Sequence, residues 1–166
     1  MDQSYQSRQM DRKPRSRDNY DDNIKPLSAD ESLIKKIVID GDVEALVNYA
    51  DKVGENLKNL DLKTNQIRNV FGSVRQIQMK WDSDPDQSFR EAVLLIPKLG
   101  YYAQRQKSSK GSKSQGMETF QNIFTPALKQ LLEPGIDNNK KKTRFQNIAD
   151  FMEAVVAYHK KYGGGD

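Results

Sequence analysis

Residues 63–81 carry four basic side chains and no acidic one, although the chain contains 23 acidic residues. Arg68 and Arg75 are seven residues apart, so on a helix they share nearly the same face, with Gly72 between them. Because arginine binds phosphate and amides can hydrogen-bond to it, this face could hold a polyanion close to the backbone at Gly72. Two alternatives stay open: the charges cover a solvated helix face, or a second helix approaches Gly72. The hydrogen-bonding side chains beside the arginines are Gln66, Asn69, Ser73 and Gln76.

A second basic segment, residues 92–117, also contains no acidic residue. Lys98 and Arg105 are again seven residues apart, with Tyr101 and Tyr102 between them. Aromatic rings can stack on unpaired bases beside a positively charged groove, although such tyrosines more often belong to the core. The two segments together predict a track for a phosphate backbone. The candidate phosphate-contacting residues are Lys63, Arg68, Arg75, Lys80, Lys98, Arg105 and Lys107.

Side chains for covalent or metal chemistry are scarce. The chain has no cysteine and one histidine, His159, so it offers no thiolate and no multi-histidine metal site. It contains no phosphate loop, no G-x-S-x-G and no HExxH motif. The glycines at 163–165 follow a helical pattern, so we expect a terminal tail there and not a nucleotide-binding loop. We therefore expect no enzyme, no cofactor and no metal site, and a structural role for His159.

The elements that would position the basic residues are helices, because no segment alternates with a period of two. We expect an all-α fold, a compact to elongated bundle of five or six helices. Ser28 and Thr64 are the predicted N-caps of the first and third helices. Pro97 predicts a kink or break in the fourth helix, and Pro126 is another proline inside a helical pattern, that of the fifth. The second helix is expected to bury Val43, Leu46, Val47, Ala50, Val53 and Leu57.

Charge and composition divide the chain into a tail and a folded part. Residues 1–25 have few aliphatic side chains and many charges of both signs, which predicts a disordered tail before a single helical domain at 26–166. Residues 26–62 hold four basic and eight acidic residues, whereas residues 63–166 hold seventeen basic and ten acidic ones. The acidic part is predicted to meet a basic neighbour. No apolar run is long enough for a membrane span or a signal peptide, so we expect the cytoplasm.

Three stretches, "LKTNQIRNVFGSV", "LLIPKLGYYAQRQ" and "FMEAVVAYHKKYGGGD", resemble in order and spacing the small subunit of the Csm complex, the type III-A CRISPR effector. The resemblance extends over about residues 28–165. It implies a non-catalytic, all-helical protein in antiviral defence. Several copies would form a short filament beside the crRNA-binding backbone subunits and hold target RNA, paired to the guide, by its phosphates.

The resemblance also assigns roles to individual residues. Arg68 matches the arginine of a Gln-Ile-Arg motif, Lys98 the second lysine of a Lys-Pro-Lys motif, and Arg105 the basic residue beyond its tyrosine. The sequence departs from the family pattern at Ile96, which replaces the first lysine, and at Gly100, where alanine is commoner. The alternatives to RNA binding are a helical adaptor that assembles proteins without contacting nucleic acid, and a membrane-surface protein that uses the basic loop at 107–116.

Overall fold

The computed structural model describes residues 24–108 and 115–166, and of Ser108 only the backbone. Within these residues it contains helices and no strand, so the all-α prediction is confirmed. The predicted tail, except for its last two residues, and most of the predicted basic loop lie outside the described residues. The elements are α1 (Glu31–Val38), α2 (Val43–Asn59), α3 (Thr64–Lys80), α4 (Pro85–Ser108), α5 (Gly116–Lys129), the 3-10 helix η1 (Gln130–Leu132) and α6 (Asn138–Lys161).

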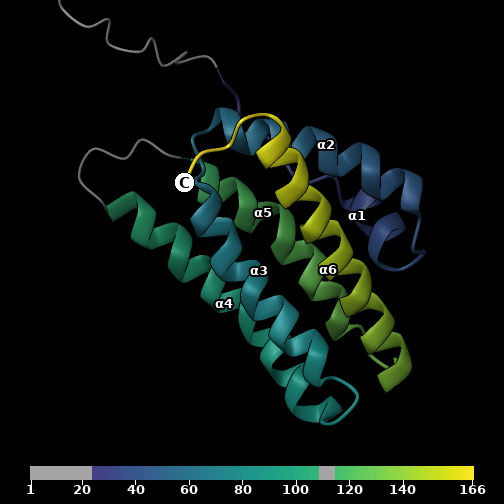
Figure 1. Ribbon diagram of the computed structural model, residues 1–166. Helices are drawn as coiled ribbons and strands as arrows, with labels where there is room; N and C mark the ends of the chain where they lie inside the picture. Colours follow the sequence, from purple (N-terminus) through teal and green to yellow (C-terminus); the bar gives the residue numbers. More distant parts are fainter. Residues whose placement is uncertain (1–23, 109–114) are drawn as a thin grey trace, which may run out of the picture.

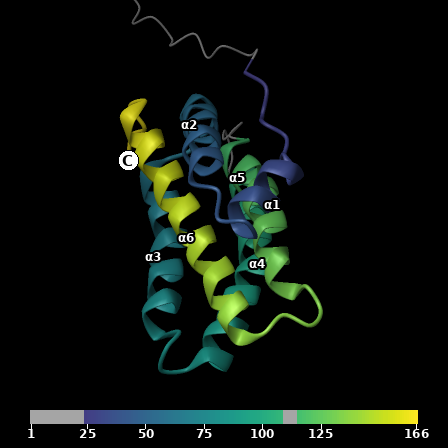
Figure 2. The same cartoon turned by 90° about the vertical axis from the view of Figure 1, so that its right-hand side faces the viewer.

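Helices α3, α4, α5 and α6 run alongside one another, and α2 crosses the bundle near the C-terminal end of the chain (Figure 1). The view turned by 90° shows α1 beside α5 and α6 (Figure 2). A short turn joins α3 to α4, so these two neighbours are antiparallel. The start of α3 therefore lies level with the second half of α4.

The helix starts correct two of the predicted caps. The N-cap of α1 is Asp30 and not Ser28, because the Asp30 carboxylate stands next to the helix and accepts from the Leu33 amide at 3.0 Å. Thr64 is the first residue of α3, and Lys63 precedes it as the N-cap. The Lys63 amide donates to Oε1 of Gln66 at 3.0 Å, which closes the first turn.

The two internal prolines do not interrupt their helices. Helix α4 continues through Pro97, so no break occurs there, and α5 likewise continues through Pro126. Pro97 lies on the exposed side of α4, where water can satisfy the carbonyl that loses its helical hydrogen bond. After Pro126, the Gln130 side chain donates to the Pro126 carbonyl at 3.2 Å, and the chain passes into η1.

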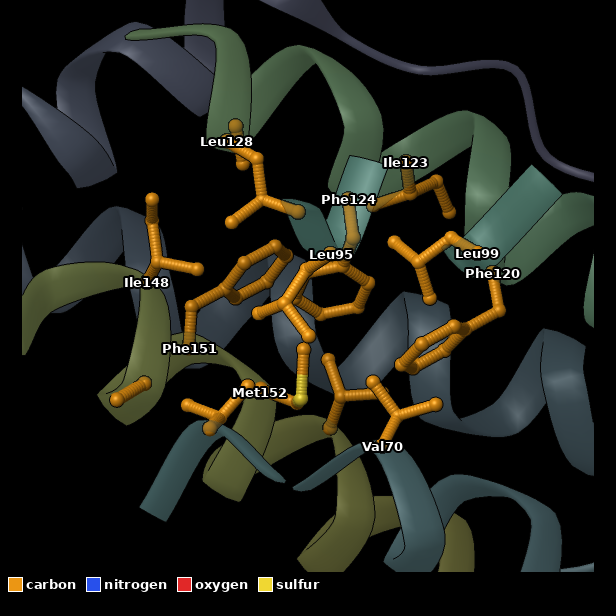
Figure 3. Packing of buried hydrophobic residues seen from close by; sticks show 14 of the residues in the cluster. Val70, Leu95, Leu99, Phe120, Ile123, Phe124, Leu128, Ile148, Phe151 and Met152 are labelled. Atoms are coloured by element: carbon orange, nitrogen blue, oxygen red, sulfur yellow. The ribbon is translucent and has the colours of Figure 1, made fainter. Parts of the chain in front are cut away.

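Aromatic rings from α2, α5 and α6 meet at the centre of the core. The ring of Phe151 lies 5.0 Å from that of Phe124 and 5.5 Å from that of Tyr49, measured between centroids. Figure 3 shows Phe124 and Phe151 among aliphatic side chains of α4, α5 and α6. Each ring buries a large apolar area, so this cluster supplies much of the hydrophobic stabilisation of the bundle.

Helix α2 buries Ala50, Val53 and Leu57 and half-buries Leu46 as predicted, but two residues of the predicted stripe are exposed. Val43 and Val47 are exposed, by 68% and 41%, whereas Tyr49 is buried. The reason is the close contact of α2 with α6 at Gly54, where a Cβ atom would lie 2.6 Å from Cβ of Tyr158. Only a glycine permits this approach, so the face around Gly54 turns inward and the two valines turn outward.

The glycine tail is fastened to the bundle. Gly163 has a φ of +91°, which ends α6 as the sequence predicts. The chain then crosses to the start of α3. There the Thr64 hydroxyl donates to the Gly164 carbonyl at 3.2 Å, and the Thr64 amide donates to the Gly165 carbonyl at 2.8 Å. These contacts explain why Thr64 does not serve as a cap.

Candidate functional site

The outer side of α3 carries the first predicted group of basic residues. Arg68, Gly72 and Arg75 are exposed, opposite a buried line of aliphatic residues. No atom of the described residues, apart from the helix itself, lies within 4 Å of a Cβ atom built on Gly72. The possibility that a second helix of this chain approaches Gly72 is therefore excluded within the described residues, and the surface at Gly72 is open.

The two arginines of α3 differ in their surroundings. Nη1 of Arg75 lies 4.0 Å from the Glu153 carboxylate of α6 and donates to Oε1 of Gln78 at 3.1 Å. The Arg75 guanidinium also lies 5.5 Å from the centroid of the Phe71 ring. These contacts hold Arg75 at the edge of α3 that adjoins α6. Arg68 makes no hydrogen bond or ion pair with any residue that the structure describes.

Lys63 and Lys80 mark the two ends of α3. Nζ of Lys63 lies 2.7 Å from the Asp61 carboxylate, so part of its charge is already compensated. Lys80 is exposed and has no ion-pair partner among the described residues, but acidic residues follow it directly in the turn to α4. These are Asp82, Asp84 and Asp86. Neither lysine adds much to a positive surface.

On α4, the predicted basic residues lie on two edges. Nζ of Lys107 lies 2.8 Å from the Glu118 carboxylate of α5. Lys98 is nine residues earlier, which on a helix is about half a turn of rotation away from Lys107. Because Lys107 faces α5, Lys98 lies on the edge that faces α3. Arg105, seven residues beyond Lys98, shares that edge.

Four of the seven predicted residues are exposed on the outer sides of two neighbouring helices, Arg68 and Arg75 on α3 and Lys98 and Arg105 on α4. We call this surface, defined by Arg68, Arg75, Lys98 and Arg105, the basic face. Figure 1 shows that α3 begins and α4 ends near the C-terminus, so Arg68 and Arg105 lie toward that end of the bundle. Both helices lack acidic residues along this part: α3 has none, and α4 has none after Glu91. Such a surface attracts polyanions.

An exposed apolar patch was missed by the sequence analysis. Ile39, Val43 and Val47 are spaced by four residues and are exposed by 39%, 68% and 41%. The acidic residues Asp40, Asp42 and Glu44 are interleaved with them. We call Ile39, Val43 and Val47 the α1–α2 patch. Val43 and Val47 belong to the stripe that the sequence predicts as buried, whereas Ile39 lies outside the predicted core stripes.

His159 is a packed histidine. Its side chain is fully buried, and Nε2 lies 2.6 Å from the Leu62 carbonyl oxygen. Burial lowers the pKa of His159, and the hydrogen bond to Leu62 partly opposes this shift. The imidazole is sealed beneath Gly164, where a Cβ atom would lie 2.1 Å from its Cε1 atom. A ring closed off in this way cannot exchange protons with a substrate.

The described part of the chain shows neither a metal site nor a membrane-spanning helix. No three His, Cys, Asp or Glu residues of 24–108 and 115–166 are close enough to hold a metal ion. No described helix combines the length and apolar character that a membrane span needs.

A family model matches most of the chain. The model, described as Csm2 Type III-A, matches residues 40–165. No curated protein and no solved structure gives a significant match. The matched region contains α2 to α6 and with them the whole basic face.

Proposed function

The chain belongs to the Csm2 family, the small subunits of the type III-A CRISPR effector called the Csm complex, and from this membership we propose that it holds RNA there through the phosphate backbone. The ligand is target RNA paired to the crRNA, and the contact surface is the basic face. The subunit itself is non-catalytic and acts in the cytoplasm as part of antiviral defence. In such a complex base pairing reads the sequence, so the protein needs charge and shape more than base-specific contacts.

The exposure of the basic face carries this proposal. Arg68 and Lys98 are exposed and form no ion pair with any described residue, so binding a phosphate would not require an internal pair to break. Asn69 and Gln76, also exposed, directly follow the two arginines in α3 and supply amides next to them. Neutralising phosphates releases counterions, which gives salt-dependent binding with little sequence preference.

Assembly with other subunits needs a separate surface, and we assign it to the acidic part of the chain. The α1–α2 patch presents apolar side chains among acidic ones, which suits a neighbour with a basic and apolar surface. If that neighbour is a second copy of this chain, the contact is head-to-tail and propagates a short filament. This patch is also the observation that favours the second candidate function, a helical adaptor that contacts no nucleic acid.

The test compares two double variants in reconstituted Csm complexes. Arg68→Ala with Lys98→Ala removes two charges from the basic face, and Lys36→Ala with Lys52→Ala removes two exposed charges from α1 and α2. We expect the first variant alone to lose target RNA, and its log-log salt slope to become shallower with each phosphate contact removed.

Two results would contradict RNA binding by the basic face. One is an Arg68→Ala/Lys98→Ala complex that holds target RNA as well as the wild type. The other is that Arg68→Glu with Lys98→Glu prevents assembly of the complex while added RNA changes nothing, which would favour the adaptor.

A further inference from the structure

One aromatic ring lies in the basic face. Tyr101 of α4 is 61% exposed, whereas every other aromatic side chain in the described residues is buried or half-buried. Its neighbour Tyr102 is half-buried and packs against the core, with the two ring centroids 5.9 Å apart and the planes tilted by 56°. Tyr102 therefore supports Tyr101 from one side and leaves much of its ring open to solvent.

The neighbours of Tyr101 along the helix are cationic. Lys98 precedes it by three residues and Arg105 follows it by four, and side chains at these spacings are adjacent on a helix surface. Leu94 and Pro97, both exposed, continue the outer side of α4 before the ring. No acidic residue occurs between Ala92 and Met117. The ring thus has a positive side chain on either side and no negative residue on its own helix nearby.

We propose that Tyr101 is a stacking platform for one unpaired base of an RNA strand, with the flanking phosphates at Lys98 and Arg105. This inference rests on the proposed function and specifies its ligand: the site takes a nucleotide whose base is free. A base inside a continuous duplex is stacked on both sides and offers no face to the ring. The ligand is therefore single-stranded RNA, or a nucleotide turned out of the guide–target duplex.

A protein partner on Tyr101 is the less favoured occupant. A protein interface on this side of α4 would have to desolvate Arg90, Lys98 and Arg105 along with the ring. Only an acidic partner could compensate these charges, and the aromatic ring would then gain little apolar contact. A nucleotide supplies both a phosphate for the cations and a flat ring for the tyrosine.

The experiment measures binding of the full chain to single-stranded oligouridylate and to a blunt RNA duplex, each with a fluorescent label. We compare Tyr101→Ala and Tyr101→Phe, with Leu132→Ala as the control for losing an exposed apolar side chain, here from η1. Tyr101→Ala should weaken single-strand binding about 5- to 100-fold, whereas Tyr101→Phe keeps the ring and should bind as the wild type does. Duplex binding should be the same for all four proteins.

A base analogue reports stacking directly. 2-Aminopurine within the oligonucleotide should lose fluorescence on binding to the wild type and to Tyr101→Phe, but not on binding to Tyr101→Ala. If Tyr101→Ala binds both RNAs normally while Arg68→Ala with Lys98→Ala does not, the stacking inference is wrong and the proposed function stands. If Tyr101→Ala instead prevents assembly of the complex without weakening RNA binding, Tyr101 contacts a protein. Wild-type protein that binds neither RNA, alone or assembled, would overturn both.

Discussion

Nε2 of His159 in α6 lies 2.6 Å from the carbonyl oxygen of Leu62, which precedes α3. A carbonyl oxygen can only accept a hydrogen bond, so Nε2 carries the proton and the neutral ring is unprotonated at Nδ1. Nδ1 is buried and has no hydrogen-bond partner among the described residues. Protonating it would place a charge in a site that water does not reach.

The stability of the protein should therefore fall in mildly acidic solution. Burial, and to a lesser extent Lys160 and Lys58, lowers the pKa of His159 below its usual value, about 6.5 in an unfolded chain. Between the two pKa values the unfolded state binds more protons, so the free energy of unfolding decreases as pH falls, by at most about 1.4 kcal/mol per pH unit. Below the pKa of the folded state this loss levels off.

Urea unfolding at pH 5.5 and at pH 7.5 measures the effect. His159→Gln offers an amide donor for the Leu62 carbonyl but does not titrate, so its unfolding midpoint should depend less on pH. An equal pH dependence in the two proteins would show that other groups cause it.

Gly164 should not tolerate a side chain. A Cβ atom there would lie 2.1 Å from Cε1 of His159, so alanine must displace the tail or the imidazole. We expect Gly164→Ala to destabilise the protein by about 1–3 kcal/mol, the usual cost of overpacking. Gly165→Ala is the matched control, because nothing lies within 4 Å of its Cβ position. Thermal unfolding of the two variants checks this, and equal melting temperatures would contradict it.

Gly72 is exposed in the middle of α3, and Gly54 is buried in the middle of α2. Replacing each with alanine should change the stability of the protein in opposite directions. Gly72→Ala should stabilise α3 by about 0.5–1 kcal/mol, because its surface is open and alanine favours the helix. Gly54→Ala should destabilise, because its Cβ atom would lie 2.6 Å from Cβ of Tyr158. Chemical denaturation measures both changes. If Gly72→Ala is more stable yet binds RNA less well, the ligand approaches the α3 backbone at this position; unchanged RNA binding would argue against such an approach.

The α1–α2 patch should matter for assembly and not for folding. Val43→Glu introduces a negative charge at a position where the side chain is already 68% exposed, so the melting temperature should change little. Incorporation into the Csm complex should fall, because the variant puts a charge where the proposed contact buries an apolar side chain. Leu132→Glu, on η1, is the control, and the measurement is copurification with the other subunits. Normal incorporation of Val43→Glu would remove the patch from consideration.

The sequence predicts the buried face of a helix correctly where the helix carries a single apolar stripe. In α3, apolar residues recur on a single stripe, and this stripe, including Ile67 and Val74, is buried. In α2, apolar residues cover a wider arc that includes Val43 and Val47, and spacing alone does not say which part of the arc is buried. The choice depends on how closely α6 approaches Gly54, a contact between residues far apart in the chain.

The same limit applies to the basic residues. The absence of acids along α3 and the second half of α4 predicts a positive surface there, and Arg68 and Lys98 are indeed exposed. It could not reveal that Lys107 pairs with Glu118, because that pair depends on where α5 packs. Local charge patterns indicate which helix surfaces are positive, whereas the neighbouring helices decide which of these charges remain uncompensated.

The hydrogen bonds from Thr64 to Gly164 and Gly165 bear on how the subunit is made. Synthesis on the ribosome delivers the start of α3 about one hundred residues before the glycines that bind it. Until residue 165 emerges, the first turn of α3 lacks its partner and His159 lacks its cover. The contacts at this end of the bundle can therefore form only after residue 165 has left the ribosome.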